Sequence, residues 1–337
     1  MLSNRQKLIL KAIVEEYVDS NEPVGSKLLT NKPYLKYSSA TIRYDMQALE
    51  ELGYLEKTHT SSGRAPSELG YRYYVDNLLI RDDRVKDSYD FINRILNNKQ
   101  LNKEDKIKDI INFLSKETGC YTAMIGSSSY YARVKKMEIV PLTNNEALLL
   151  IVTNTGVVKS QKITIPKEFL MDDLLKIIAM FDVAMYDQGI FEIREILTRE
   201  AMKPRLRQMV DFRDEVFNFL IKGFSAFMNN ECFQAGMSQL IKHEEFKNID
   251  TISKIIKVID EDKLKEYMLE TVHNLQVRIG SENLDIGLDD CSIITIPYYL
   301  DENEFGTLCL VGPKRMKYNR NIPLLEYVAN NLPKIYK

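Results

Sequence analysis

The chain of 337 residues is 45% hydrophobic and 28% charged, a composition that is typical of globular proteins and excludes wholesale disorder and collagen-like repetition. Its length predicts two or three domains. The formal net charge is −2, so any binding of nucleic acid requires basic groups gathered on one face rather than a basic chain overall.

The N-terminus mixes charged and apolar residues, so it lacks the apolar core of a signal peptide. Ser3 and Gln6 form a capping-box pattern, and apolar residues then recur at helical spacing. Pro23 and Gly25 end this helix, and a second, shorter helix is predicted at residues 26–30. The chain is therefore expected to begin with two consecutive helices.

A third helix is capped by Ser38 or Ser39 and ends at Gly53. The side predicted to pack in the core consists of Ile42, Met46, Leu49 and Leu52. The opposite side gathers polar groups near the helix N-terminus: Ser39, Thr41, Arg43, Tyr44 and Gln47. In a helix that enters the major groove, this region reaches the base edges. A merely solvated polar face is an equally open interpretation of these residues.

A strand is predicted at residues 54–58, followed by a polar, glycine-containing loop at residues 59–66 and a renewed apolar pattern at residues 71–79. Three helices, a strand and a basic loop are the order of a winged helix-turn-helix. The loop residues that can contact phosphates or the minor groove are His59, Thr60, Ser61, Ser62 and Arg64. His59 and Arg64 can instead cap local turns. The connection before the third helix is longer than the roughly three or four residues of a compact helix-turn-helix.

Several segments form a distinctive set. Near the N-terminus these are NRQKLILKAIVEEYVDSNEPVGSK, SSATIRYDMQALEELGYLEKTHTSSGRAP and ELGYRYYVD, and near the other end they are RIGSEN, DCSII and GPKRMKY. Together they resemble the HrcA family of heat-inducible transcription repressors, and the resemblance spans nearly the whole chain. The sequence departs from the family pattern at Tyr44, where asparagine is expected, and at Glu244, where proline is expected before Glu245 and Phe246.

The resemblance implies an α+β multidomain protein with a winged helix, a GAF-like domain with an antiparallel sheet, and a helical dimerisation segment inserted into that domain. The expected boundaries are 1–80 for the DNA-binding domain, 81–165 for a helical linker and the first half of the GAF-like domain, 166–230 for the insertion, and 231–337 for the second half. It also implies a cytoplasmic homodimer that represses chaperone operons at an inverted-repeat operator in double-stranded DNA. Heat relieves this repression, and the GroE chaperonin assists the active repressor.

Residues 82–119 predict two helices, with Asn102 and Asp105 at the start of the second. Strands are predicted at residues 121–125, 134–140, 147–153 and 157–165, and the turn signals between them indicate one antiparallel meander. Residues 167–228 predict helices whose apolar stripe consists of Phe212, Val216, Phe219, Leu220 and Phe224. This stripe forms either a dimer seam or an intrachain core, and both alternatives stay open.

The last part of the chain predicts helices at residues 249–259 and 264–273, strands at 276–279, 292–297 and 306–311, and a final helix from Pro323. The glycine motifs at residues 280–283 and 312–315 match neither common nucleotide-binding pattern, so turn or interface roles are favoured over anion binding.

Catalytic and metal-binding patterns are not recognised in the sequence. The cysteines at 120, 232, 291 and 309 are scattered and are expected to be buried free thiols, and the three histidines are isolated. No enzyme activity, metal or cofactor is therefore expected, and the longest apolar runs are too short to predict a membrane span. The alternative function is that of a winged-helix regulator whose GAF-like domain senses a small ligand, which fold analogy alone cannot assign.

Overall fold

The computed structural model describes residues 2–57, 63–82, 86–125, 133–143, 145–154, 156, 158–165, 171–189, 232–261, 263–270, 274–300 and 305–335. The chain divides into two compact units. Unit 1 comprises Met1–Met124, Phe233–Tyr298 and Thr307–Lys337, and unit 2 comprises Ile125–Cys232 and Tyr299–Gly306. The fold is mixed α/β with antiparallel strand pairs, as expected of an α+β protein. Within the described ranges, no helix is both long enough and apolar enough to cross a membrane.

Unit 1 opens with α1 (Asn4–Ser20), α2 (Ser26–Leu29), α3 (Ser39–Glu51), β1 (Leu55–Lys57) and β2 (Arg64–Pro66). The capping box at Ser3 is confirmed, and β1 and β2 pair antiparallel. The predicted loop position of Arg64 is wrong, because Arg64 lies in β2 and exchanges backbone hydrogen bonds of 2.9 and 3.0 Å with Val24. This pairing joins residues far apart in the sequence, so no local pattern predicts it.

The core side of α3 differs from the prediction at its last position. Ile42, Met46 and Leu49 are buried, but Leu52 is 55% exposed. Leu52 is the C-cap of α3, and the chain turns away at Gly53, whose φ is 81°. The helical period therefore no longer sets the direction of this side chain.

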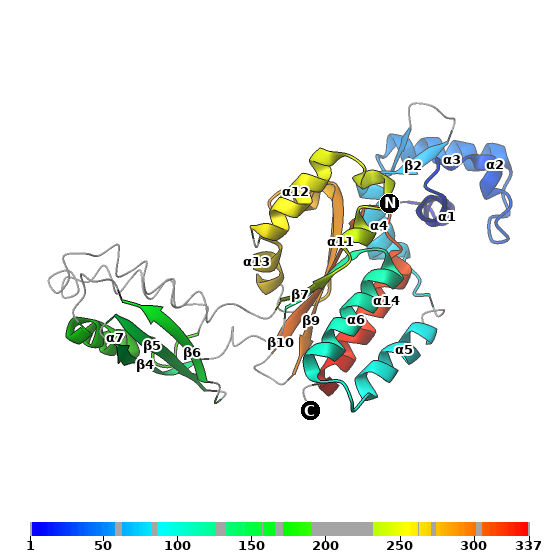
Figure 1. Cartoon of the computed structure of the whole chain (residues 1–337). Helices are drawn as coiled ribbons and strands as arrows, with labels where there is room; N and C mark the ends of the chain where they lie inside the picture. The colour runs from blue at the N-terminus through cyan, green and yellow to red at the C-terminus, as the bar shows by residue number, and fades with distance from the viewer. Residues whose placement is uncertain are drawn as a thin grey trace. The chain divides into compact units, whose positions relative to one another are not determined.

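The chain continues through α4 (Glu68–Tyr73) and the π-helix η1 (Tyr74–Leu78). Ser67 caps α4, because its hydroxyl oxygen accepts a 3.1 Å hydrogen bond from the Gly70 N–H. Figure 1 shows α4 between the N-terminal helices and the sheet that forms the body of unit 1.

The body of unit 1 is a five-stranded sheet in the order β7 (Cys232–Ala235), β3 (Tyr121–Ile125), β10 (Phe305–Pro313), β9 (Cys291–Tyr299) and β8 (Gln276–Ile279). Its long helices are α5 (Lys86–Asn97), α6 (Lys103–Thr118), α12 (Ile249–Asp260), α13 (Lys263–Glu270) and α14 (Tyr318–Asn331), with the short α11 (Met237–Leu240) after β7. In Figure 1, α5, α6 and α14 lie on one side of the sheet and α12 and α13 on the other.

Two predictions for this body are corrected. The first predicted strand of the meander, β3, belongs to the five-stranded sheet, because it pairs with β7 and β10 rather than with the strand that follows it in sequence. The final helix begins at Tyr318 rather than at Pro323. Proline has no N–H to donate to the carbonyl of Asn319, and that carbonyl instead accepts a 3.0 Å hydrogen bond from the Asp82 N–H.

Other predicted features of the body are confirmed. Asn102 caps α6 by accepting a 2.9 Å hydrogen bond from the Asp105 N–H. The cysteines at 120, 291 and 309 are buried, but Cys232 is exposed, so the prediction of burial is wrong for that residue. Burial raises the pKa of the Cys120 thiol to about 12, which leaves it protonated and unreactive at neutral pH.

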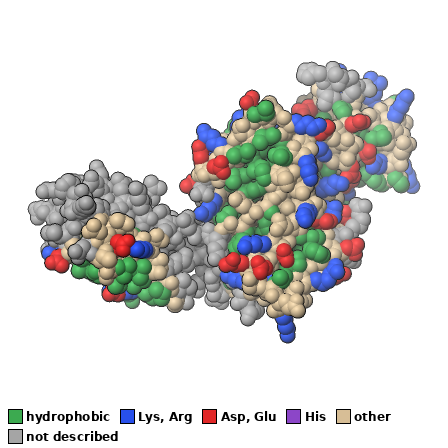
Figure 2. Space-filling view, in the orientation of Figure 1, with side chains coloured by type: hydrophobic (Ala, Val, Ile, Leu, Met, Phe, Trp, Pro, Cys, Tyr) green, Lys and Arg blue, Asp and Glu red, His purple; other side chains and the backbone are tan. Residues whose placement is uncertain are grey.

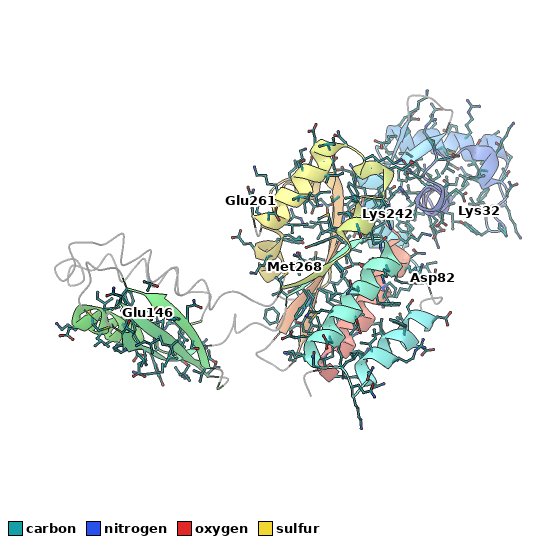
Figure 3. All side chains as sticks on the ribbon, in the orientation of Figure 1. Lys32, Asp82, Glu146, Lys242, Glu261 and Met268 are labelled. Atoms are coloured by element: carbon teal, nitrogen blue, oxygen red, sulfur yellow. The ribbon has the colours of Figure 1, made fainter. Side chains whose placement is uncertain are left out.

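Unit 2 contains the meander formed by β4 (Val134–Thr143), β5 (Glu146–Thr153) and β6 (Val158–Thr164), together with α7 (Met171–Met185). The side chains of β5 alternate in burial, and α7 contributes Leu174, Ile177, Ile178 and Phe181 to the core beneath the sheet. Figure 3 labels Glu146 at the start of β5, where Lys162 Nζ lies 2.8 Å from its carboxylate. The predicted stripe from Phe212 to Phe224 lies outside the described residues.

Candidate nucleic-acid interface

The N-terminal end of α3 is organised by hydroxyl groups. Ser38, one of the two predicted caps, accepts a 3.1 Å hydrogen bond from the Thr41 N–H. Its hydroxyl also lies 2.9 Å from Thr41 Oγ1, and Ser39 Oγ lies 3.0 Å from Ser26 Oγ. Ser39 and Thr41, both predicted to contact DNA, therefore hold the start of α3 in place and join it to α2.

The other predicted residues of α3 lie on its exposed side. Tyr44 is 71% exposed, and Arg43 and Gln47 are also exposed. Gln47 Nε2 donates a 3.1 Å hydrogen bond to Glu51 one turn further along the helix. The structure thus brings Arg43, Tyr44 and Gln47 together on one accessible surface.

The residues of the β1–β2 connection are only partly described. His59, Thr60, Ser61 and Ser62 lie outside the described residues. The side chain of Arg64 is 16% exposed, and its Nε donates a 2.6 Å hydrogen bond to Glu50 Oε2 on α3. Arg64 therefore holds the hairpin against α3, and part of its charge is neutralised.

A cavity of about 590 Å³ opens between α2, α3 and the hairpin. It is lined by Gly25, Ser26, Lys27, Ser39, Ala40, Arg43, Met46, Lys57 and Arg64. Among the described residues that line it, none is acidic, so the cations make this place locally positive. Phosphate groups are attracted to such a place.

Lys27 and Lys57 are cavity residues that the sequence prediction missed. Lys57 lies directly opposite Arg64 in the antiparallel register, and Lys27 is the second residue of α2. The strand prediction over residues 54–58 included Lys57, but the register that places it beside Arg64 depends on the tertiary pairing. Figure 2 shows basic and acidic side chains interspersed over the presented face of unit 1, so this cavity contrasts with the mixed surface.

A second missed feature is the buried carboxylate of Asp45, which is 2% exposed on the core side of α3. Arg5 on α1 donates to both of its oxygens, at 2.5 and 3.3 Å, and the Arg5 guanidinium lies 5.7 Å from the centre of the Tyr37 ring. In the helical period, Asp45 lies on the same side as the core residues Ile42 and Leu49. Because a buried charge is costly without a partner of opposite sign, this position could have predicted a cationic partner.

We expect Arg5→Met to lower the melting temperature, because it leaves the Asp45 carboxylate buried without its cation. The double variant Arg5→Met/Asp45→Leu is expected to recover much of the loss, since it removes both charges. Arg81→Met is the matched control, because Arg81 pairs with Glu326 while its side chain is 64% exposed. Differential scanning calorimetry of the four proteins measures the effect, and equal melting temperatures for Arg5→Met and wild type would contradict it.

The long connection between α2 and α3, noted in the sequence, is held to α1. Lys32 Nζ lies 2.6 Å from Glu16 Oε2, and Figure 3 labels Lys32 in this connection. Leu35, in the same connection, is buried. The extra length is therefore held in place by an ion pair to α1 and by a buried side chain of its own.

Comparisons with known proteins identify the family. The family model described as HrcA protein C terminal domain matches residues 104–322. The heat-inducible transcription repressor HrcA of Acholeplasma laidlawii is 40% identical over 337 residues, covering 100% of this chain and 98% of that relative. The proteins of that name from Phytoplasma australiense and Halalkalibacterium halodurans are 38% and 34% identical; the alignments cover 99% of this chain and 99% and 98% of those relatives.

A solved structure also resembles the whole chain. It is described as the crystal structure of a hypothetical protein, and it matches with a TM-score of 0.60 at 23% identity, covering 100% of this chain and 99% of that chain. This similarity supports the fold alone. From the family match and the full-length relatives, the chain belongs to the HrcA family of heat-inducible transcription repressors.

Proposed function

We propose that α1, α2, α3 and the β1–β2 hairpin form a winged helix-turn-helix that binds double-stranded operator DNA, with α3 in the major groove. The observation that carries this proposal is the cavity beside the exposed start of α3, which is lined by Lys27, Arg43 and Lys57 and by Arg64, whose charge is shared with Glu50. It supplies the local concentration of basic groups that the overall charge of the chain does not.

Within this interface the residues have different roles. Arg43, Tyr44 and Gln47 face the bases, since their side chains are exposed on α3 and can form hydrogen bonds. Lys27 and Lys57 bind phosphates, while Ser39 and Thr41 hold the start of the helix in place. His59, Thr60 and Ser62 are further proposed DNA contacts, and Arg64 supports the hairpin by its pairing with Glu50.

The remaining parts of the proposed architecture rest on family membership. Residues 1–80 are the DNA-binding domain, 81–165 and 231–337 contain the two halves of a GAF-like domain, and 166–230 belong to an inserted dimerisation segment. The division into compact units favours an insertion that begins earlier, near Ile125, because β4, β5 and β6 share a core with α7. The dimer seam consists of Phe212, Val216, Phe219, Leu220 and Phe224. Two-fold symmetry of the homodimer then matches an inverted-repeat operator.

Heat is proposed to inactivate the repressor by opening its fold. Opening exposes apolar side chains, and chains in that state aggregate or bind chaperonins, which accounts for assistance by GroE. The chain acts on chaperone operons in the cytoplasm without a cofactor and without catalysis, in agreement with the repressor name of its relatives.

The experiment is a footprint of the full chain on the DNA upstream of its own gene. Protection of an inverted repeat is expected for wild type and for Lys108→Ala, a control at an exposed cation on α6. Protection is expected to be weakened by Arg43→Ala and by Lys57→Ala. A footprint without repeat symmetry, or one that Arg43→Ala and Lys57→Ala leave unchanged, would contradict the proposed docking.

A further inference from the structure

The two glycine motifs of unit 1 contact the N-terminal segment, which runs from α1 to η1 and carries α3. Residues 280–283 form the 3-10 helix η6 (Gly280–Asn283) directly after β8, and residues 312–315 comprise the last two residues of β10 and the turn that follows. Both belong to the body of unit 1, and both contact groups on α4 or α1. They therefore have the interface roles that the sequence favoured over anion binding.

Glu68, the first residue of α4, is held by both motifs. Its Oε2 accepts hydrogen bonds from the Ser281 N–H at 3.0 Å and from the Ser281 hydroxyl at 2.7 Å. Its Oε1 accepts a 3.0 Å hydrogen bond from Lys314 Nζ. Partial burial acts to raise the pKa of Glu68, but the bonds from Ser281 and the charge of Lys314 outweigh it, so the pKa lies below its ordinary value and the carboxylate is ionised at neutral pH.

Gly280 makes room for this carboxylate. A Cβ at position 280 would lie 2.1 Å from Glu68 Oε1, and the φ of Gly280 is +56°, in the left-handed region that favours glycine. The backbone of η6 thus approaches the carboxylate more closely than any other residue type permits.

Arg72, one turn further along α4, makes a second set of contacts with the body. Its Nε and Nη2 donate to the two carboxylate oxygens of Glu282 at 3.1 and 3.0 Å, and Nη2 also donates to the Val277 carbonyl at 2.5 Å. Forked pairs of this kind fix orientation as well as distance. We name the group of Glu68, Arg72, Ser281, Glu282 and Lys314 the α4 latch.

Further contacts join α1 to the same side of the body. Arg315 is paired with Glu245 and donates to the Val18 carbonyl at 3.4 Å. Lys317 Nζ lies 2.8 Å from Asp19. These contacts lie near the C-terminal end of α1, so together with the α4 latch they hold the N-terminal segment at two places.

We propose that Glu68 is a positioning residue for operator binding: through the α4 latch it fixes the segment carrying α3 on the body of unit 1 and thereby sets the half-site spacing that the dimer accepts. This inference rests on the proposed function. In a dimer, the distance between the two α3 helices depends on every contact that fixes each helix relative to the two-fold axis. The α4 latch is one such set of contacts. Half-sites must be separated by a defined number of base pairs for both helices to dock at once.

The test is a selection of duplexes from a random-sequence DNA pool by the full-length chain, followed by sequencing. The variant is Glu68→Ala, and the control is Glu104→Ala, which removes an exposed carboxylate paired with Lys108 inside α6. The half-site sequence reports on the base contacts of α3, whereas the spacing between half-sites reports on the α4 latch. A duplex with one half-site is titrated in parallel.

Wild type and Glu104→Ala are expected to select inverted repeats with a single spacing. Glu68→Ala is expected to select the same half-site at several spacings, with an unchanged affinity for the single half-site. If only about one dimer in five keeps both chains docked, the apparent Kd for the wild-type spacing rises about fivefold. Selection of the single wild-type spacing at wild-type affinity by Glu68→Ala would overturn the proposal.

Two further outcomes are decisive. If the wild-type chain selects no inverted repeat, the proposed function itself is wrong, and the spacing role is overturned with it. If Glu68→Ala loses the circular dichroism spectrum of the folded chain, Lys314→Met is used instead, because it removes one bond to Glu68 and leaves both bonds from Ser281. The same expectations for spacing and single half-site affinity then apply to Lys314→Met.

Discussion

Replacing Arg43 with alanine is expected to weaken binding to operator DNA by about 5- to 150-fold while changing binding to scrambled DNA much less. A guanidinium that pairs with both acceptors of a guanine discriminates against other bases by about 1 to 3 kcal/mol. Arg43 is exposed on α3 and lines the cavity between α2, α3 and the β1–β2 hairpin, a position that suits such a contact. Titrations of operator and scrambled duplexes by fluorescence anisotropy, over a series of salt concentrations, measure both affinities.

Lys57→Ala is the informative comparison for Arg43→Ala. A lost phosphate contact weakens all sequences alike and reduces the slope of log affinity against log salt by about one. Arg64→Ala is expected to change the slope less, because the Arg64 charge is shared with Glu50. Gln47→Ala is expected to reduce the difference in affinity between operator and scrambled DNA and to leave the salt dependence unchanged. Full discrimination by both Arg43→Ala and Gln47→Ala would show that α3 is not the element that reads the bases.

Replacing Gly70 with alanine is expected to destabilise the protein by about 2 to 3 kcal/mol, although alanine in a helix is normally more stable than glycine by about 1 kcal/mol. The added Cβ would lie 2.1 Å from the carbonyl oxygen of Tyr54. That carbonyl already accepts a 3.1 Å hydrogen bond from the Ser67 N–H, so it cannot move away without losing the bond that sets the start of α4. The backbone contact therefore outweighs helix propensity, and urea denaturation followed by circular dichroism measures the loss.

Gly25→Ala is the matched control for Gly70→Ala. A Cβ at position 25 meets no atom within 4 Å, and the φ of −92° suits any residue. Its effect on stability is expected to stay within about 0.5 kcal/mol. A midpoint of denaturation for Gly70→Ala equal to that of Gly25→Ala would contradict the close contact between α4 and Tyr54.

Local patterns in the sequence were sufficient for most of the elements. The capping box at Ser3, the cap at Asn102 and the apolar periodicity of α3 and α6 act over three or four residues, so they can be recognised without the fold. The exposed surface of Arg43, Tyr44 and Gln47 follows from the same period. The position of Leu52 was mispredicted because the period ends where Gly53 turns the chain.

The sequence by itself determined most of the helices and strands and which side of α3 faces outward, because these depend on the period of the backbone and on caps within one turn. Only the tertiary structure decided the place of β3 between β7 and β10, the pairing of Arg5 with Asp45, the register of Lys57 opposite Arg64, and the α4 latch. Each of these joins residues that are distant along the chain. Such partners are selected by packing and by the cost of leaving a buried charge or a strand edge unpaired, which no short stretch of sequence records.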